Sequence, residues 1–306
     1  MIVGVRCKQN SNPPSAPAPV RSWLYILPES FLPDFETRLA NADVLCIGVF
    51  RLNQIGQLTA KPTLTRDQKS RLTNARMNRK IYPLISLTNA YDGAQLLANN
   101  SRRAVTTLVA LLKEESYDGL HIDFEYLTGR SSDHYVSFLK LLKEHPGMQG
   151  KTLSIAANPP LQGTAEQIAF FDLQKLDLVT DEIVFMTYDY HMERAGPVTH
   201  LGWAEENMKL AFRHIRPEKV WLGVPAYGYE WKPGSTRPSV LSEAQGLELC
   251  KRYGCKRHDS GCLTVNSQGR QVYFADKETR ISMRDLAKRL GVRGTALWRV
   301  GFEATF

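Results

Sequence analysis

Eight short runs of apolar or β-branched residues recur along the 306-residue chain and constrain its fold more than any other feature. In chain order they cover residues 23–27, 44–50, 81–87, 119–125, 152–157, 183–188, 220–226 and 295–300. Helical patterns lie between most of them, such as the apolar stripe of Tyr135, Phe138 and Leu142. Strands that alternate with helices are typical of a parallel sheet. Eight such units predict an α/β fold of the (β/α)8 TIM barrel type.

The gap between the last two runs is nearly double the usual spacing. It contains a predicted helix at 242–253, a turn-rich stretch and a predicted strand at 271–275. We therefore expect a small α+β insertion over about residues 231–292, within a single barrel unit that covers residues 21–306. Loops that follow barrel strands lie at the C-terminal rim, where barrel active sites are built. The insertion should therefore form one wall of a cleft.

The two ends of the sequence say little about location. Residues 1–20 include the Pro-rich stretch 12–19, which cannot build a core and is predicted to be disordered or an extended tether. The first residues lack the apolar segment of a secretory signal, so the chain as written looks unexported. A truncated start would give the same pattern, and localisation stays open between the cytoplasm and the exterior or cell wall. No apolar run approaches the roughly 18 residues of a membrane span.

Composition is that of an ordinary globular protein, with 43% hydrophobic and 23% charged residues. Lys and Arg (39) exceed Asp and Glu (31), which gives a net charge of +8. The basic residues are spread along the chain instead of forming one tract, so the charge identifies no partner. We expect a monomer that binds neither nucleic acid nor a membrane.

Five cysteines leave at least one thiol unpaired in a monomer. Cys46 lies inside an apolar run and is predicted to be a small buried residue. Cys250, Cys255 and Cys262 are close in sequence, and Cys255 with Cys262 could bridge a hairpin in an oxidising compartment. Unpaired thiols are the equal alternative, and the spacing matches no zinc pattern.

The fourth run carries the polar residues of greatest interest, His121, Asp123 and Glu125. On a β-strand their spacing of two places all three side chains on one face, with large apolar neighbours on the other. Two neighbouring carboxyl groups on a buried face repel when both are ionised, so one should hold its proton at neutral pH. That is the requirement for a general acid.

Two other interpretations apply to this pattern. A polar strand face usually faces solvent in an antiparallel sheet, but the Asp118-Gly119 pair and the preceding helical run 104–115 favour a βα unit that is covered on both faces. A metal site would use the same residue types. One strand supplies a single imidazole and no second ligand cluster is evident, so we predict no metal and no cofactor.

Four segments carry a resemblance to a known family. Residues 118–125 resemble the strand-four signature DGxDxDxE of glycoside hydrolase family 18, the chitinase-like (β/α)8 barrels. Residues 186–189 are similar to its strand-six MxYD, and residues 223–228 to its strand-seven GxPxYG. Trp298 is similar to the tryptophan that floors the sugar site. The pattern is most similar to bacterial spore-cortex and cell-wall N-acetylglucosaminidases of the family.

The resemblance implies a retaining hydrolase of β-1,4-linked N-acetylglucosamine glycans, in which the substrate's own acetamido group is the nucleophile. Glu125 would be the general acid and then the base. Asp123 would hold the acetamido N–H, and Tyr188 the acetamido oxygen. Chitin oligomers and peptidoglycan both carry this group, and the sequence does not separate them. The alternative is a catalytically weak or inactive chitinase-like lectin.

The resemblance also implies a set of substrate-binding side chains. They are Asp189, Met186, Trp298, Tyr227, His121 and Trp23.

The chain departs from the family pattern at three places. His121 stands where the signature has its second aspartate, and it could accept a hydrogen bond from Asp123, titrate near neutral pH or fill space. Residues 86–89 lack the SxGG of typical processive chitinases. Tyr229 replaces an arginine that often follows the strand-seven glycine. These changes argue against a standard secreted endochitinase.

Overall fold

The computed structural model describes residues 19–304. The predicted disordered segment, residues 1–20, therefore lies almost entirely outside the described residues, as does Cys7. Within the described range, no helix has the length and apolar character needed to cross a membrane.

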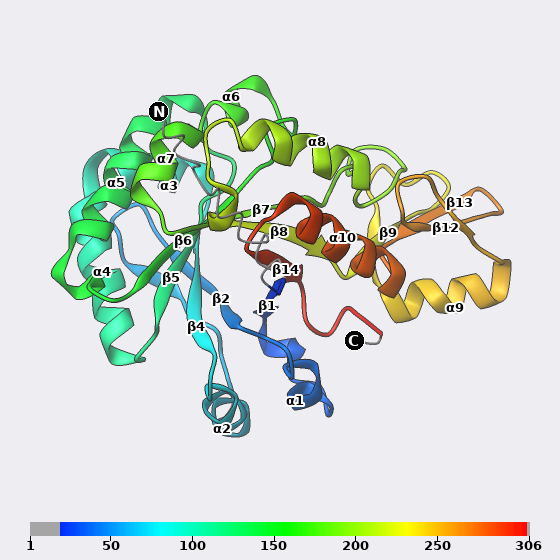
Figure 1. Ribbon diagram of the computed structural model, residues 1–306, viewed down its shortest axis with the longest axis horizontal. Helices are drawn as coiled ribbons and strands as arrows, with labels where there is room; N and C mark the ends of the chain where they lie inside the picture. The colour runs from blue at the N-terminus through cyan, green and yellow to red at the C-terminus, as the bar shows by residue number, and fades with distance from the viewer. Residues whose placement is uncertain (1–18, 305–306) are drawn as a thin grey trace, which may run out of the picture.

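Eight parallel strands close into a barrel, and the predicted fold class is confirmed (Figure 1). The first strand pairs with both the second and the last, which closes the sheet. One further short strand forms an antiparallel hairpin with the second. The barrel strands are β1 (Arg21–Ile26), β2 (Val44–Leu52), β4 (Lys80–Leu87), β5 (Gly119–Asp123), β6 (Thr152–Ala157), β7 (Glu182–Phe185), β8 (Val220–Pro225) and β14 (Gly294–Trp298), and the hairpin strand is β3 (Leu58–Ala60).

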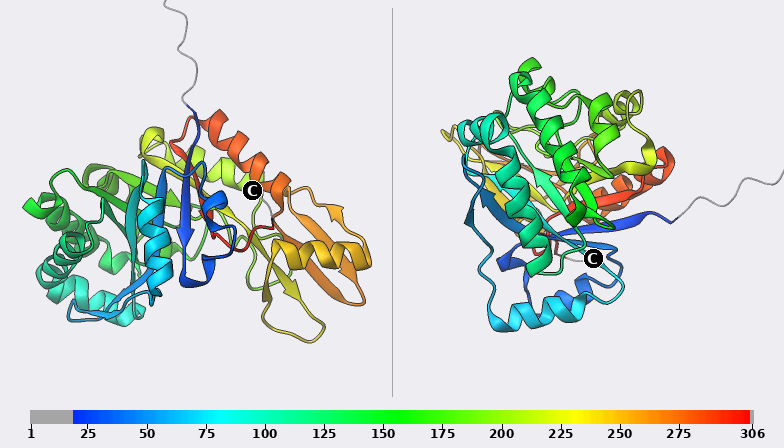
Figure 2. Two further views of the ribbon diagram at one scale, coloured as in Figure 1. Left: turned by 90° about the horizontal axis from the view of Figure 1, so that it is seen from below. Right: turned by 90° about the vertical axis from the view of Figure 1, so that its left-hand side faces the viewer.

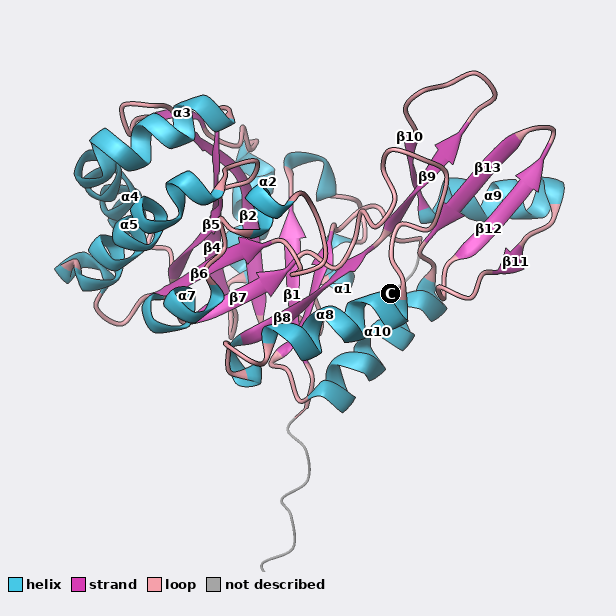
Figure 3. Cartoon of the chain, turned by 90° about the horizontal axis from the view of Figure 1, so that it is seen from above, coloured by secondary structure: helices cyan, strands magenta, loops and turns pink. Residues whose placement is uncertain are grey.

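Helices follow most of these strands and cover the outside of the barrel (Figures 1 and 3). They are α1 (Phe35–Arg38), α2 (Arg66–Ala75), α3 (Ala90–Gln95), α4 (Ser101–Glu114), α5 (Ser132–Glu144), α6 (Ala165–Ile168), α7 (Leu173–Val179), α8 (Leu201–Ala211) and α10 (Lys277–Leu290).

Side-chain alternation along the strands separates two apolar cores. On β5, Leu120 and Ile122 are fully buried in the outer core between strands and helices. His121, between them, points the other way and contacts the rings of Trp23 and Tyr25. The inner core fills the barrel with Trp23, Tyr25, Val44, Cys46, Tyr82, Leu84, Val184, Trp221 and Ala296.

A second, antiparallel sheet projects from the barrel after β8 (Figures 1 and 2). Its strands, in spatial order, are β10 (Ser239–Ser242), β9 (Tyr227–Trp231), β13 (Arg270–Phe274), β12 (Leu263–Ser267) and β11 (Lys256–Arg257), and α9 (Glu243–Tyr253) packs on it. A Cβ atom at Gly246 of α9 would lie 2.7 Å from the Phe274 ring, so the helix approaches the sheet closely. The sheet begins before the predicted boundary near residue 231. Helix α10, which the prediction placed inside the insertion, packs on the barrel against α8, β8 and β14.

The cysteines pair differently from the sequence-based suggestion. A disulfide joins Cys250 near the end of α9 to Cys255, with Cα atoms 4.9 Å apart. Cys262 is a buried thiol that bonds to the carbonyl oxygen of Thr199, at 3.4 Å, whereas Cys255 is exposed. The suggested Cys255–Cys262 bridge is therefore wrong. Cys46 is a buried thiol of the inner core, as predicted.

Candidate active site

The carboxyl pair lies where strand β5 ends. The strand stops at Asp123, and the backbone then leaves the sheet, so Glu125 follows the strand instead of lying in it. Alternation nevertheless continues, because Phe124 is fully buried on the outer side and packs on Tyr135 and Phe138 of α5. This anchoring directs Asp123 and Glu125 together into one cavity at the C-terminal end of the barrel.

Burial sets the electrostatics of the pair. It raises the pKa of Asp123, and the negative charge of Glu125 raises it further. Burial also raises the pKa of Glu125. Hydrogen bonds with Tyr126 and Asp123 act in the opposite direction and lower this pKa. The two groups therefore compete for one proton at neutral pH. Asp123 Oδ1 is buried and makes no hydrogen bond.

The segment after β7 supplies the second group of polar residues. The strand ends at Phe185, and Met186, Tyr188 and Asp189 follow it into the cavity. Asp189 has a left-handed backbone, with φ of 57°, which is uncommon outside glycine. Two phenols from β9 hold its Oδ1 atom: Tyr227 donates one hydrogen bond and Tyr229 donates another, of 2.6 Å.

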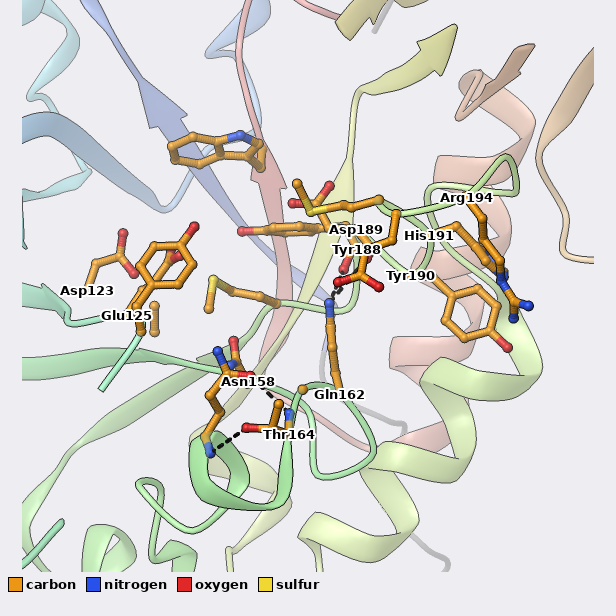
Figure 4. Close-up of a pocket in the computed structure, with 18 of the residues that line it drawn as sticks. Asp123, Glu125, Asn158, Gln162, Thr164, Tyr188, Asp189, Tyr190, His191 and Arg194 are labelled. Atoms are coloured by element: carbon orange, nitrogen blue, oxygen red, sulfur yellow. Dashed lines mark hydrogen bonds between the residues drawn. The ribbon is translucent and has the colours of Figure 1, made fainter. Parts of the chain in front are cut away.

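The cavity has a volume of about 960 Å³, at the upper end of the range for small-molecule sites. Asp123 and Glu125 lie on one side of it, and His191 and Arg194 on the other (Figure 4). Trp298 also lines the cavity and packs edge-on against Tyr25, with ring centroids 5.1 Å apart.

Seven of the nine predicted site residues lie in or next to this cavity. Six line it directly: Glu125, Asp123, Tyr188, Asp189, Met186 and Trp298. Tyr227 lies next to the cavity and donates a hydrogen bond to Asp189, which lines it. Trp23 and His121 do not line the cavity; both are 0% exposed and lie deeper in the barrel.

Several cavity residues were not predicted from the sequence. Tyr25 was missed although it follows Trp23 by two positions on the same inward face of β1. Gln162, in the loop after β6, donates a 3.1 Å hydrogen bond to the carbonyl oxygen of Tyr188 and fixes one wall. The remaining lining residues lie in β6, in α6 and in the segments that follow β5, β6 and β7: Tyr126, Ala156, Asn158, Gly163, Thr164, Gln167, Tyr190, His191, Met192, Glu193 and Arg194. A polar loop residue carries no strand-like periodicity that would have identified it.

Within residues 19–304, no three His, Cys, Asp or Glu side chains converge on a possible metal position. The cavity offers carboxyl groups, phenols and a flat indole ring in a concave pocket. A closed barrel with a carboxyl pair and an aromatic floor at its C-terminal rim is the arrangement of a sugar-cleaving barrel enzyme.

Comparison with known proteins agrees with this class. The sequence model of one protein family, the glycosyl hydrolases family 18, matches residues 29–303 of this chain. The chain therefore belongs to the glycosyl hydrolases family 18.

Individual relatives are distant in sequence. The chain is 26% identical to the uncharacterized glycosylase YvbX of Bacillus subtilis over 70% of this chain and 67% of the relative. It is 24% identical to a cortical fragment-lytic enzyme of Bacillus cereus, over 76% of this chain and 60% of the relative. The chain thus spans only three fifths to two thirds of these proteins.

The crystal structure of a class V chitinase from Pseudomonas fluorescens Pf-5 has the same fold. Its TM-score is 0.81, at 20% identity, with 93% of this chain and 96% of that chain covered.

Proposed function

We propose that the protein is a retaining glycosidase that hydrolyses β-1,4-linked N-acetylglucosamine glycans with the help of the substrate's acetamido group. The observation that carries the proposal is the convergence of Asp123, Glu125, Tyr188 and Trp298 on one cavity. Membership in the family supports it. The names of the relatives support two substrate classes, chitin oligomers and peptidoglycan.

The carboxyl pair fits a general acid, Glu125, that receives its proton when the substrate binds. An acetamido N–H would donate a hydrogen bond to the unpartnered Asp123 Oδ1. Such a bond favours ionised Asp123, so the shared proton moves to Glu125. Glu125 then protonates the glycosidic oxygen as the bond to the anomeric carbon breaks.

The acetamido oxygen attacks the anomeric carbon as the leaving group departs, and an oxazolinium ion forms. Ionised Asp123 stabilises the positive charge on its N–H, and Tyr188 orients the acetamido group. A held intramolecular nucleophile has an effective concentration of roughly 10⁵ to 10⁸ M, so no enzyme nucleophile is required. Glu125 then takes a proton from water, which attacks the same carbon and restores the β configuration.

The test uses mass spectrometry of products from chitin oligomers, peptidoglycan and N-glycans. Wild type should cleave at least one of the first two, and Glu125→Gln should lose at least about a thousandfold in kcat, since acid and base roles are both removed. Glu144→Gln is the matched control, because Glu144 is an exposed residue of α5.

Equal activity of wild type and Glu125→Gln would reject the proposal, and sugar binding without cleavage would leave a lectin. NMR of early products adds a second criterion, because an α-anomer as the first product excludes retention.

A further inference from the structure

His121 is held at both ring nitrogens inside the barrel. Its Nε2 atom lies 2.8 Å from the hydroxyl of Tyr25, and its Nδ1 atom lies 3.0 Å from the hydroxyl of Ser154 on β6. The Trp23 ring packs edge-on against the imidazole, with centroids 4.9 Å apart. A neutral imidazole has one donor and one acceptor, and each hydroxyl group can supply the complement. The ring is therefore fixed in position and satisfied without a charge.

Burial also keeps the ring uncharged. The side chain is 0% exposed, and burial lowers the pKa of His121 to about 3. The imidazole is consequently neutral across the pH range in which most enzymes work. Of the three roles open at the sequence level, titration near neutral pH is thus disfavoured by this environment.

The position of His121 relates it directly to the carboxyl pair. It precedes Asp123 by two residues on the same inward face of β5. Tyr25 connects the buried imidazole to the cavity. Its hydroxyl contacts His121, and its side chain lines the cavity beside Asp123 and Trp298. The family signature has a carboxyl group at position 121, so this chain carries one fewer acid below its active site.

We propose that His121 is a positioning residue, which fixes Tyr25 beneath the cavity and keeps a further carboxyl group out of the barrel interior below Asp123 and Glu125. The inference rests on the proposed glycosidase function. It assigns to His121 no contact with the substrate.

The consequence is a particular pH dependence. Glu125 must hold the last proton of the pair to act as an acid. A further buried carboxylate at position 121 would repel the negative charge of the pair, so the pair would hold that proton up to a higher pH. Other titratable groups that act on the pair come from several elements. They are Tyr25 of β1, Cys46 of β2, Tyr126, Tyr135 of α5, Tyr188 and Asp189. All of these side chains are still present after a substitution at position 121, and Tyr25 is the one among them whose hydroxyl bonds directly to that position.

The first experiment compares pH–kcat profiles of wild type, His121→Asn and His121→Asp on one chitin oligomer or peptidoglycan fragment. His121→Asn keeps a neutral side chain with one donor and one acceptor, so kcat should fall several-fold while the alkaline limb stays in place. His121→Asp should move the alkaline limb upward by about one pH unit or more. Coincident alkaline limbs in His121→Asp and wild type would overturn the proposal, as would equal shifts in both variants.

The second experiment does not depend on activity. Carbon-13 NMR of labelled side-chain carboxyl groups follows the titration of Asp123 and Glu125 in the same three proteins, and nitrogen-15 NMR follows the His121 ring. Wild type should show two coupled carboxyl transitions and no imidazole transition between about pH 4.5 and 8. A His121 transition in that range would sink the inference.

The two kinds of failure are distinguishable. If wild type cleaves no glycan, the proposed function fails, while the carboxyl titrations still decide the role of His121. If His121→Asp does not fold, the carboxyl titrations can still be compared between wild type and His121→Asn. In that case unequal pKa values of the carboxyl pair in these two proteins would contradict the proposal.

Discussion

Tyr229 donates a 2.6 Å hydrogen bond to Asp189, and a residue of the inserted sheet thereby holds a carboxyl group of the barrel cavity. Tyr227, on the same strand β9, donates to the same Oδ1 atom. The insertion therefore does more than wall the cleft: it sets the position of a side chain whose backbone has a left-handed φ. The tyrosine at position 229, noted as a departure from the family pattern, has a defined partner.

Tyr229→Phe should lower kcat/KM about tenfold, because Asp189 loses one of two charge-assisted bonds, worth ~1.5 kcal/mol. Burial raises the pKa of Asp189 and the phenol bonds lower it, so the variant should also need a higher pH for full activity. Tyr273→Phe is the matched control, since Tyr273 pairs with Tyr229 across the sheet and packs against His258. The same loss in both variants would show that the sheet, and not the hydrogen bond, matters.

Asp123→Asn should stabilise the protein at neutral pH. Burial and Glu125 raise the pKa of Asp123 in the folded state. A carboxyl group with a raised folded pKa contributes stability below its unfolded pKa, and that contribution is lost as pH rises through the folded value. Wild type should therefore lose stability as pH rises above about 4, the usual range of an aspartate, and Asp123→Asn should be more stable than wild type by a margin that grows toward pH 7 and vanishes near pH 4.

Urea unfolding at several pH values measures this difference. The exposed Asp133→Asn serves as the control, and its difference from wild type should not follow the same pH dependence. A variant that is less stable than wild type at pH 7 would contradict the prediction and would assign a structural role to the Asp123 carboxylate.

The sequence located the barrel strands well because each is a short apolar run, and burial on both faces of a parallel strand produces such a run. It located their ends less well. β5 ends at Asp123 and β7 ends at Phe185, whereas the cavity residues Glu125 and Tyr188 lie beyond these strand ends. Ladder hydrogen bonding ends there, and residue type alone does not reveal where pairing stops.

The sequence pattern predicted Trp23 as a cavity residue, whereas Tyr25 lines the cavity, and this error has a different physical cause. Both residues face the barrel interior, because alternate residues of a strand point the same way. Depth along the strand decides which of them reaches the cavity, and depth depends on the register with β2 and β14. Register is a property of the closed sheet, so a single strand sequence does not contain it.

Trp298→Ala should weaken oligosaccharide binding by ~2 kcal/mol, or roughly thirtyfold, because the indole offers a large flat surface for a sugar ring. Trp298→Phe should recover part of this loss. Calorimetry in the Glu125→Gln background measures binding without turnover. Equal affinities of the alanine variant and its parent would remove Trp298 from the floor of the site.

The last prediction concerns the segment after β14, which is held to α1 by an ion pair. Arg38 Nη1 and Glu303 Oε1 are 2.5 Å apart, and the Glu303 side chain is completely buried. Glu303 also accepts the backbone N–H of Gly301, so its carboxylate organises the chain just beyond Trp298.

Glu303→Gln should lower the free energy of unfolding by ~3 kcal/mol, since the largely buried Arg38 loses the negative charge of a fully buried partner. Asp34→Asn is the matched control, because Asp34 binds the same arginine at 2.8 Å from a half-exposed position and should cost little. Thermal and urea unfolding distinguish the two. If both variants lose the same stability, the buried position of Glu303 adds nothing, and the segment after β14 is held by its apolar contacts instead.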